Sequence, residues 1–413
     1  MDWSRALIRA AHDRGLTVVV ADTAENLESV ESSPRTTIVE VDWRSGTEVT
    51  ALALALAEGD LGAVVAFREF SLHATAQAAA ACGLPWNSVA SIELTRDKLA
   101  CREAVQRLGY RQPTSVACSD VVQALAALGS TGLPAVVKPR SAYGSQGVAL
   151  VTEPAQVAGA FASAARFAPS VLVEEFVEGA EFSAEGGFVD GRPVLLAVTC
   201  KRVAGETSFV ETGHRTADDL ADDVVDEVRR TLEDVLPGLG LTHSLFHVEF
   251  WLTARGLVLG EVHSRTGGDW IHRLAQESSG IDPFALVLDN LMGTATVGQD
   301  VLGSTGSAAA VSAIPSSYGV VDALLGLADV CADPRLLVLD LSVVRGSVLT
   351  APTESGHRAG LVVARSARGT AAGERGVDAA RTADRLACEI DLVTDVGGSD
   401  TARARDVAAS LAP

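Results

Sequence analysis

The chain has 413 residues, 47% of them hydrophobic, which is enough for two or three packed domains. Its 53 acidic and 33 basic residues give a formal net charge of −20. This charge argues against binding to nucleic acids or to an anionic membrane, so we expect neither as a partner. The six cysteines form no C-x-x-C pair, and no long uncharged apolar run exists. Charged residues interrupt the first ten positions, where a signal peptide would need an apolar run, so we expect a cytoplasmic protein.

Only three of the 33 basic residues are lysines: Lys98, Lys138 and Lys201. Arginine replaces lysine readily on a surface, but it does so poorly where a compact, rotatable ammonium group is needed. Lysines that persist in such an arginine-rich chain should therefore be enriched at functional sites.

The first predicted elements alternate between helices and short apolar strands: helix 3–14, strands 16–21 and 37–41, helix 47–58, strand 62–67 and helix 71–82. This alternation predicts a small Rossmann-like parallel α/β domain over residues 1–92. Such domains usually open with a strand, so we expect that a first strand is lost or lies before the recorded start.

The later elements are more mixed: helices 95–108 and 119–128, strands 133–139, 148–151, 171–175, 181–189 and 193–199, helix 217–235, a hairpin of strands 245–252 and 257–263, and helix 283–291. A linker at 294–307 precedes further strands and a helix at 375–388. The expected fold class is mixed α/β, with further domains over 93–172, 173–300 and 301–413.

A predicted strand delivers Lys138 to the loop 141–147, which leads into a second strand. Its glycines, including Gly147, allow backbone N–H groups to close over an anion, and Ser145 is one of its small polar residues. A Walker A motif is absent and no helix follows. The pattern predicts either a flap over nucleotide phosphates or an ordinary hairpin.

Residues 174–181 read Glu-Glu-Phe-Val-Glu-Gly-Ala-Glu. In a nucleotide hinge, Glu174 would accept a hydrogen bond from the adenine amine and Val177 would offer backbone groups. Glu181, beyond the turn, would accept from the ribose hydroxyls. The alternative is an acidic surface turn.

The predicted hairpin turns near residue 255, which would place Glu249 opposite Glu261 and His247 opposite His263. Facing carboxylates repel unless a cation lies between them, and Mg²⁺ prefers carboxylate and phosphate oxygens. An exposed acidic face is the alternative. His243 and His247 have the spacing of a helical zinc pair, but the alternation of this segment favours a strand.

Arg265 ends the second strand of the hairpin and is followed by Gly267 and Gly268. A fixed cation at this position suits a developing phosphoryl or acyl oxyanion.

In this order the motifs resemble the ATP-grasp superfamily, specifically its carboxylate–amine ligases. The resemblance covers about residues 1–395 and implies an ATP-grasp fold with a C-terminal lid region, with ATP and Mg²⁺ or Mn²⁺ as cofactors. The residues that it assigns to ATP are Lys98, Lys138, Ser145, Gly147, Glu174, Glu175, Phe176, Val177 and Glu181. It assigns catalysis to Lys138 and Arg265, and the metal to Glu249, Glu261 and His263.

One position departs from the family pattern, because the family usually has asparagine where this chain has His263. A neutral imidazole binds hard Mg²⁺ less willingly than an amide oxygen does. We therefore expect one metal to be held differently or its site to be weakened.

The segment from Lys201 to His214 is most similar to L-amino-acid ligases of the bacilysin-synthetase type. A matching Glu-x-x-His pair in those ligases lies beside the substrate amino group, and it falls here on Glu211 and His214. A polar loop is the alternative reading. The substrate-side residues that the resemblance implies are Glu69, Lys201, Glu211, His214, Arg265 and Gly268.

The implied reaction is ATP-dependent amide formation through an acyl phosphate, with an amino acid as one substrate, in natural-product biosynthesis. The expected partners are a small-molecule carboxylate and an amine, and the family suggests a homodimer. Two alternatives stay open. One is a ligase that uses another amine or a carrier-protein thioester, and the other is a nucleotide-binding regulatory protein with a decayed metal site.

Overall fold

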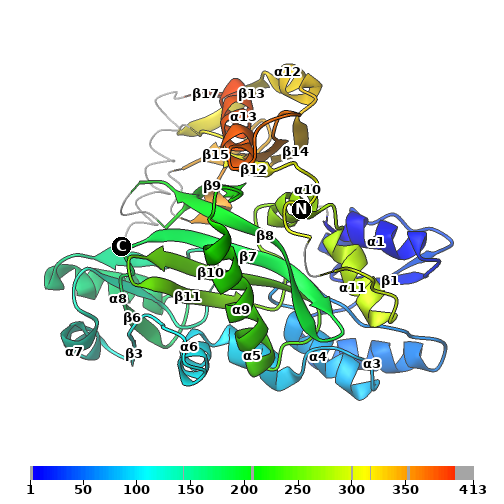
Figure 1. Ribbon diagram of the computed structural model, residues 1–413, viewed down its shortest axis with the longest axis horizontal. Coiled ribbons are helices and arrows are strands. Elements are labelled where there is room, and N and C mark those ends of the chain that lie inside the picture. Colours follow the sequence, from blue (N-terminus) through cyan, green and yellow to red (C-terminus); the bar gives the residue numbers. More distant parts are fainter. Residues whose placement is uncertain are drawn as a thin grey trace.

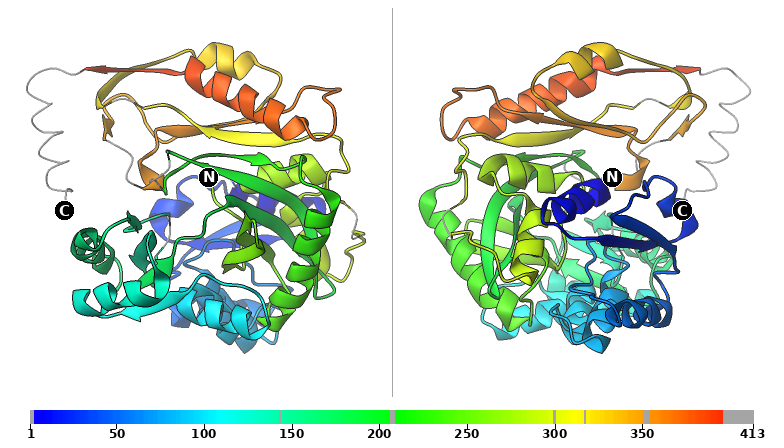
Figure 2. Two further views of the ribbon diagram at one scale, coloured as in Figure 1. Left: turned by 60° about the vertical axis from the view of Figure 1, so that its left-hand side comes forward. Right: turned by 90° about the vertical axis from the view of Figure 1, so that its right-hand side faces the viewer.

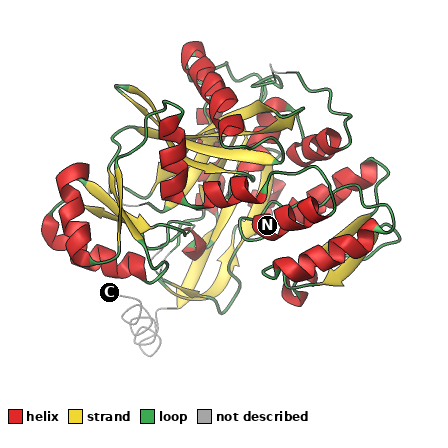
Figure 3. Ribbon diagram, turned by 90° about the horizontal axis from the view of Figure 1, so that it is seen from below, coloured by secondary structure: helices red, strands yellow, loops and turns green. Residues whose placement is uncertain are grey.

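The structure is a computed structural model that describes residues 3–142, 144–205, 209–298, 301–316, 318–350 and 354–395, without the side chains of Trp3 and Asp395. Parts of the predicted substrate segment, linker and C-terminal region lie outside the described residues. The strands occupy the middle of the molecule and helices surround them (Figure 3). Within the described ranges, no helix is long and apolar enough to cross a membrane.

The N-terminal elements are α1 (Trp3–Asp13), β1 (Val18–Asp22), α2 (Ala24–Leu27), β2 (Thr36–Glu40), α3 (Gly46–Ala57) and α4 (Leu72–Ala81). β1 pairs in parallel with β2, as predicted. The predicted strand 62–67 is wrong, because that segment is a loop without ladder bonds. Its Phe67 packs edge-on against Phe284, with ring centroids 5.2 Å apart. A run of apolar residues indicates that a segment is buried. A loop that packs on the core shows the same run as a strand does.

The predicted helix 95–108 corresponds to α6 (Lys98–Arg107), and a helix that was not predicted, α5 (Val89–Arg96), directly precedes it. Asp97 separates them, with extended backbone at φ −91° and ψ 100°. Its carboxylate accepts hydrogen bonds from the N–H groups of Leu99 and Ala100, which stabilises the start of α6. Lys98 is therefore the first residue of a new helix.

The next subdomain is a four-stranded antiparallel sheet in the order β3-β6-β4-β5. Its elements are β3 (Ser115–Cys118), α7 (Val121–Thr131), β4 (Ala135–Pro139), β5 (Ala149–Val151), η1 (Pro154–Gln156), α8 (Val157–Ala165) and β6 (Val171–Glu175). Buried residues of α7 and α8 form one apolar cluster with the strands. Lys138 lies in β4, next to the predicted flap.

The largest sheet has eight antiparallel strands in the order β11-β10-β7-β8-β9-β12-β16-β14. Its first half contains β7 (Ala180–Val189), β8 (Arg192–Val203), β9 (Glu211–Thr216), α9 (Asp222–Gly238), β10 (Leu245–Thr253) and β11 (Gly256–His263). Phe182, Phe246 and Phe250 lie on one face and pack with α9, which crosses that face in Figure 1. Strand alternation therefore directs the intervening polar residues to the opposite face.

The C-terminal part continues this sheet, because β12 pairs with β9. Two helices precede it, α10 (Ile271–Ser279) and α11 (Pro283–Leu291), the second with its predicted bounds. Its elements are β12 (Ala309–Ala313), β13 (Gly319–Leu325), α12 (Leu327–Ala332), β14 (Leu336–Leu341), β15 (Val348–Leu349), η2 (Ser355–His357), β16 (Gly360–Arg365), α13 (Arg375–Glu389) and β17 (Asp391–Asp395). β15, β13 and β17 form a separate sheet. Figure 2 shows this part seated on the central body.

Asp218, just after β9, joins α13 to the central body. Its carboxylate accepts hydrogen bonds from the N–H groups of Gly373, Arg375 and Gly376, at 3.1, 3.2 and 2.8 Å. A carboxylate at a helix N-terminus satisfies unpaired N–H groups and complements the helix dipole. This contact therefore stabilises the seating of the C-terminal part.

We expect Asp218→Ala to lower the free energy of unfolding by about 1–2 kcal/mol, the cost of losing a helix cap. The neighbouring Asp219→Ala removes an exposed pair with Arg215 at 2.8 Å and should cost less than about 1 kcal/mol. Urea denaturation of both variants measures the difference. Equal losses in the two variants would contradict the role of Asp218.

Candidate functional site

The polar face of the eight-stranded sheet gathers ionisable residues from five neighbouring strands. They are Glu181 and Glu185 of β7, Lys201 of β8, Glu211 and His214 of β9, His247 and Glu249 of β10, and Glu261 and His263 of β11. We call this set the acidic face. Ion pairs connect it to Lys98 of α6 and Lys138 of β4, so all three lysines of the chain lie here.

Lys98 and Lys138 converge on the carboxylate of Glu261. Lys98 Nζ pairs with Oε2, and Lys138 Nζ lies 3.3 Å from Oε1. Burial acts to raise the pKa of Glu261, but the two ammonium groups outweigh it and hold the pKa well below its usual range. Residues 40 positions apart thus present two cations to one anion.

Glu174 links Lys138 to a buried arginine that the sequence patterns did not single out. Its carboxylate accepts from Arg102 Nε and Nη2 at 2.7 and 3.0 Å, from Lys138 at 2.8 Å and from Ser115 at 2.9 Å. Burial opposes ionisation, but Arg102 and Lys138 lower the pKa of Glu174 to about 2. With its oxygens engaged, Glu174 orients Lys138 in this structure, and the predicted adenine contact stays a prediction. Arg102 lies one helical turn after Lys98, a spacing that could have identified it.

The rest of the predicted hinge follows β6. Glu175 points away from Glu174 and pairs with Arg111 at 3.0 Å. The N–H of Phe176 donates to the carbonyl oxygen of Pro134 at 3.4 Å, and Val177 is buried.

The hairpin register is confirmed for His247 opposite His263, but it then shifts by one residue. A bulge sets Gly260 and Glu261 together against Glu249. Burial and the charge of Glu261 act to raise the pKa of Glu249, but Lys201 and His247 outweigh them and hold it well below its usual range. Glu261 therefore still faces Glu249, as predicted, but it shares that position with Gly260, and the two carboxylates influence each other.

His247 bridges two carboxylates, which the sequence analysis did not foresee. Its Nδ1 lies 2.6 Å from Glu185 and its Nε2 lies 3.2 Å from Glu249. Burial acts to lower the pKa of His247, but Glu185 and Glu249 raise it to about 10. The two carboxylates thus hold His247 as an imidazolium, and it orients Glu249 in return.

His263 contacts Glu261 at 3.3 Å through Nε2 and Glu69 at 3.5 Å through Nδ1. In the part of the chain that the structure describes, no group of three or more His, Cys, Asp or Glu is arranged to hold a metal. The metal site at Glu249, Glu261 and His263 therefore stays a prediction, and of these side chains the two carboxylates offer the oxygen ligands that a hard divalent cation prefers. In this geometry His263 acts as a hydrogen-bonding partner of Glu261.

Glu69, which follows the segment 62–67, connects the N-terminal domain to the site. Arg265 Nε donates to its Oε2 at 2.8 Å, and Arg96 lies 3.4 Å from Oε1. Burial acts to raise the pKa of Glu69, but His263 and Arg265 hold it well below its usual range. Glu69 therefore fixes Arg265 at the end of β11. Gly268, close by, has open space where a Cβ would lie.

Lys201 lies between Glu181 at 2.8 Å and Glu211 at 3.4 Å. A Glu-x-x-His spacing in a regular strand would put the two side chains on opposite faces. Here a bulge inserts Thr212 opposite the junction of Arg202 and Val203. The extra residue brings Glu211 back to the side of Lys201.

His214 lies directly opposite Lys201 and is buried. Its Nε2 lies 3.4 Å from Asp269, while its buried Nδ1 has no hydrogen-bond partner among the described residues. Asp269 forms a bidentate pair with Arg358, both bonds 2.5 Å long. Asp269 and Arg358 had no sequence signal, because a long stretch of chain separates them.

The predicted flap has left-handed backbone at Ser145, with φ of 62°, where it is unfavourable, and at Gly147, with φ of 66°, where glycine adopts it freely. A Cβ on Gly147 would lie 2.8 Å from the ring of Phe167, so glycine is required there. Ser145 Oγ donates to the carbonyl oxygen of Phe209, at 2.9 Å. The flap thus contacts the segment that leads into β9.

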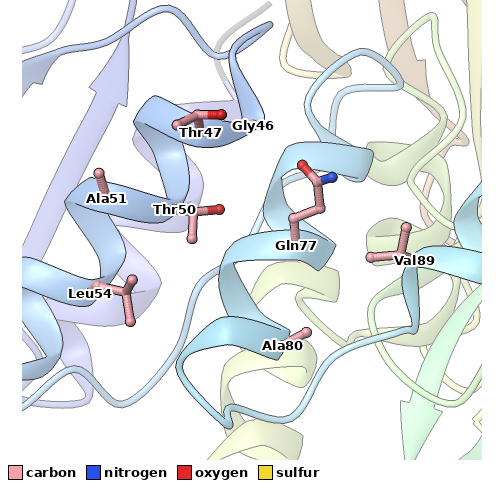
Figure 4. A pocket seen from close by; sticks show the side chains of 8 residues that line it. All are labelled: Gly46, Thr47, Thr50, Ala51, Leu54, Gln77, Ala80 and Val89. Carbon is pink, nitrogen blue, oxygen red and sulfur yellow. The ribbon is translucent and has the colours of Figure 1, made fainter.

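A hollow of about 600 Å³ lies elsewhere, between α3 and α4 (Figure 4). Its lining is mostly apolar and contains no ionisable side chain: Gly46, Thr47, Thr50, Ala51, Leu54, Gln77, Ala80 and Val89. Chemistry on charged substrates needs charged groups, so the acidic face remains the candidate site.

Two family models match separate parts of the chain. A model of the ATP-grasp domain matches residues 131–273, and a model of L-amino acid ligase C-terminal domain 2 matches residues 313–395. No curated protein sequence matches the chain.

Solved structures share the fold over nearly the whole chain. An L-amino acid ligase from Bacillus licheniformis aligns with a TM-score of 0.78 at 20% identity, covering 94% of this chain and 95% of that chain. A phosphoribosylglycinamide synthetase from Anaerococcus prevotii aligns at 0.68 and 15%, covering 94% and 96%. A carboxyaminoimidazole ribonucleotide synthase from Aspergillus clavatus, complexed with ATP, aligns at 0.70 and 13%, covering 92% and 94%.

We expect Glu174→Gln to destabilise the protein by about 3–5 kcal/mol at pH 7, because it leaves Arg102 buried without its counter-ion. The folded pKa of about 2 lies below the ordinary value of 4.5. The stabilisation is therefore present above about pH 4.5 and is lost as the pH falls toward 2. Urea denaturation should show a smaller gap between variant and wild type at pH 3.

Glu175→Gln is the matched control, since it removes an adjacent but half-buried pair with Arg111. Its effect should stay below about 1 kcal/mol. A gap for Glu174→Gln that is independent of pH would contradict the ion-pair account.

Proposed function

Since the chain belongs to the ATP-grasp superfamily and carries an L-amino acid ligase C-terminal domain, we propose that it is an ATP-dependent ligase. It joins a carboxylate to an amine, one of them an amino acid, through an acyl phosphate. The observation that carries the proposal is the convergence of Lys98 and Lys138 on Glu261. Two ammonium groups beside a carboxylate pair suit a phosphate chain neutralised by a divalent cation.

In this proposal Lys98 and Lys138 exchange their contacts with Glu261 for ATP phosphates. Glu249 and Glu261 would then hold Mg²⁺, which supplies charge neutralisation at the phosphates. Arg102 holds the carboxylate of Glu174, and Glu174 in turn keeps Lys138 in place. The lysines thus serve as counter-ions of Glu261 and, in the complex with ATP, as phosphate ligands.

The first step joins a substrate carboxylate oxygen to the γ-phosphorus of ATP. The bond from that phosphorus to the β,γ-bridging oxygen breaks, and ADP leaves. Catalysis rests on alignment and charge neutralisation, because phosphoryl transfer asks little covalent chemistry of the protein. Arg265, held by Glu69 at 2.8 Å, supplies a fixed cation beside the reacting oxygens.

In the second step an amine attacks the acyl carbon, and inorganic phosphate leaves as the amide forms. The amine arrives as an ammonium ion and must lose a proton. Glu211 can bind the ammonium, and His214 can accept the proton at Nδ1 when its Nε2–H faces Asp269. The burial of Nδ1 without a partner supports this assignment.

We expect Glu261→Gln to reduce amide formation by at least about 100-fold, because it removes a carboxylate from the cation-binding pair. Product mass and ADP release, measured across a matrix of amino acids and amines, test this result. Glu233→Gln, on the exposed side of α9, is the control and should retain wild-type turnover. Unchanged turnover in Glu261→Gln would overturn the metal assignment.

Glu211→Ala and His214→Ala should impair the use of the amino acid while sparing ATP. We expect the KM or kcat for the amine to worsen about 10- to 100-fold, as for lost substrate positioning or proton transfer. Nucleotide affinity, measured by calorimetry with Mg²⁺ and ADP, should stay unchanged. Parallel loss of nucleotide affinity would remove both residues from the substrate side.

A further inference from the structure

A short segment of the C-terminal part reaches the acidic face. It comprises residues 354–358, between β15 and β16, and we call it the clasp. The N–H of Ser355 donates to the carbonyl oxygen of Gly144 at 3.3 Å, and its hydroxyl donates to Glu211. Arg358 donates to Asp269 and, at 3.2 Å, to the carbonyl oxygen of Glu211.

The three partners of the clasp belong to three separate parts of the proposed site. Gly144 lies in the flap, Glu211 begins β9, and Asp269 lies in the loop after Arg265. The flap serves the phosphates in the proposed function, whereas Glu211 and Asp269 serve the amine. The clasp therefore connects the two substrate sides through residues that are far apart in the sequence.

The contacts of Arg358 suit a residue that positions its neighbours rather than one that binds a substrate. All three of its side-chain nitrogens donate to protein oxygens, including Nε to the carbonyl oxygen of Ser355 at 2.7 Å. Its side chain and that of Asp269 are each only 12% exposed. An arginine whose three nitrogens are all engaged fixes geometry, because a planar guanidinium holds its partners in set directions.

The segment that Arg358 holds is strained. Asp269 and Trp270 both have positive φ, 51° and 61°, although neither is glycine. Such conformations are unfavourable for residues other than glycine and persist where the surroundings impose them. A second contact from the C-terminal part, Asp340 with Trp270 Nε1 at 2.7 Å, acts on the same segment. The C-terminal part therefore imposes the geometry that presents Asp269 to His214.

We propose that Ser355 and Arg358 are positioning residues that hold the flap and the amine side together, so that the amine attacks the acyl phosphate before water does. This inference rests on the proposed function. Attack by water on the acyl carbon would release phosphate and regenerate the carboxylate, so ATP and water would give only ADP and phosphate. A loosened clasp thus raises the ADP released per amide formed.

The test compares wild type with Ser355→Ala, Arg358→Lys and Arg358→Gln. ADP and amide are quantified in the same reactions, and nucleotide affinity is measured by calorimetry with Mg²⁺ and ADP. We expect amide formation to fall about 10-fold or more while ADP release falls less, because small misplacements at a reacting centre are costly. Arg358→Lys should show an intermediate ratio, since it keeps the charge but not the planar fork.

Arg345→Gln is the matched control, since it breaks an exposed pair with Asp322 at 2.9 Å in the same part of the chain. Its ratio of ADP to amide should equal that of wild type. Arg358→Gln leaves Asp269 buried without a counter-ion, so a double variant with Asp269→Asn removes both charges. If the Arg358 variants fail to fold, Ser355→Ala still tests the inference, because it removes only one hydroxyl group.

Each outcome either supports or contradicts the role of Ser355 and Arg358. A wild-type ratio in Ser355→Ala and in the folded Arg358 variants would overturn the inference alone. Equal losses of nucleotide affinity and amide formation would also overturn it, because they indicate a general structural defect. A wild type that forms no amide with any pair in the matrix would overturn the proposed function, and this inference with it.

Discussion

The structure depends on neutralising carboxylates that one sheet face brings together. Burial disfavours each charge, and neighbouring carboxylates disfavour one another, so the face is stable only with cations between them. Lys98 and Lys138 supply that charge at Glu261, and Lys201 supplies it between Glu181 and Glu211. In the proposed function, Lys98 and Lys138 would exchange these contacts for the phosphates of ATP.

Two irregularities in the sheet decide which groups meet on this face. The bulge at Glu249 changes how it opposes Glu261, and the bulge at Thr212 brings Glu211 beside Lys201. Bulges are common beside functional sites because one extra residue redirects a side chain while most of the ladder is kept. Regular pairing would separate Glu211 from Lys201, and the extra residue Thr212 brings them to the same side of the sheet.

The C-terminal part belongs to the catalytic body and is not a separate appendage. Its β12 extends the central sheet, Asp218 caps its helix α13, and the clasp contacts the flap and Asp269. In the proposed function, an acyl phosphate must be kept from water, which requires several elements to close together. Contacts that span these elements meet that need without adding a group that touches the substrate.

Sequence alone determined the lysine pattern, most of the helices and strands, and the acidic hairpin, because these follow from local spacing, composition and strand period. The strand prediction failed at Phe67, because a buried apolar loop has the same residue pattern as a strand. The helix prediction missed the boundary at Asp97, whose side chain caps the start of α6. Only the tertiary structure decided which cation neutralises which carboxylate. Arg102 with Glu174, and Arg358 with Asp269, pair across 72 and 89 positions of the sequence. Such pairs arise from the packing of whole elements, and no local pattern records that packing.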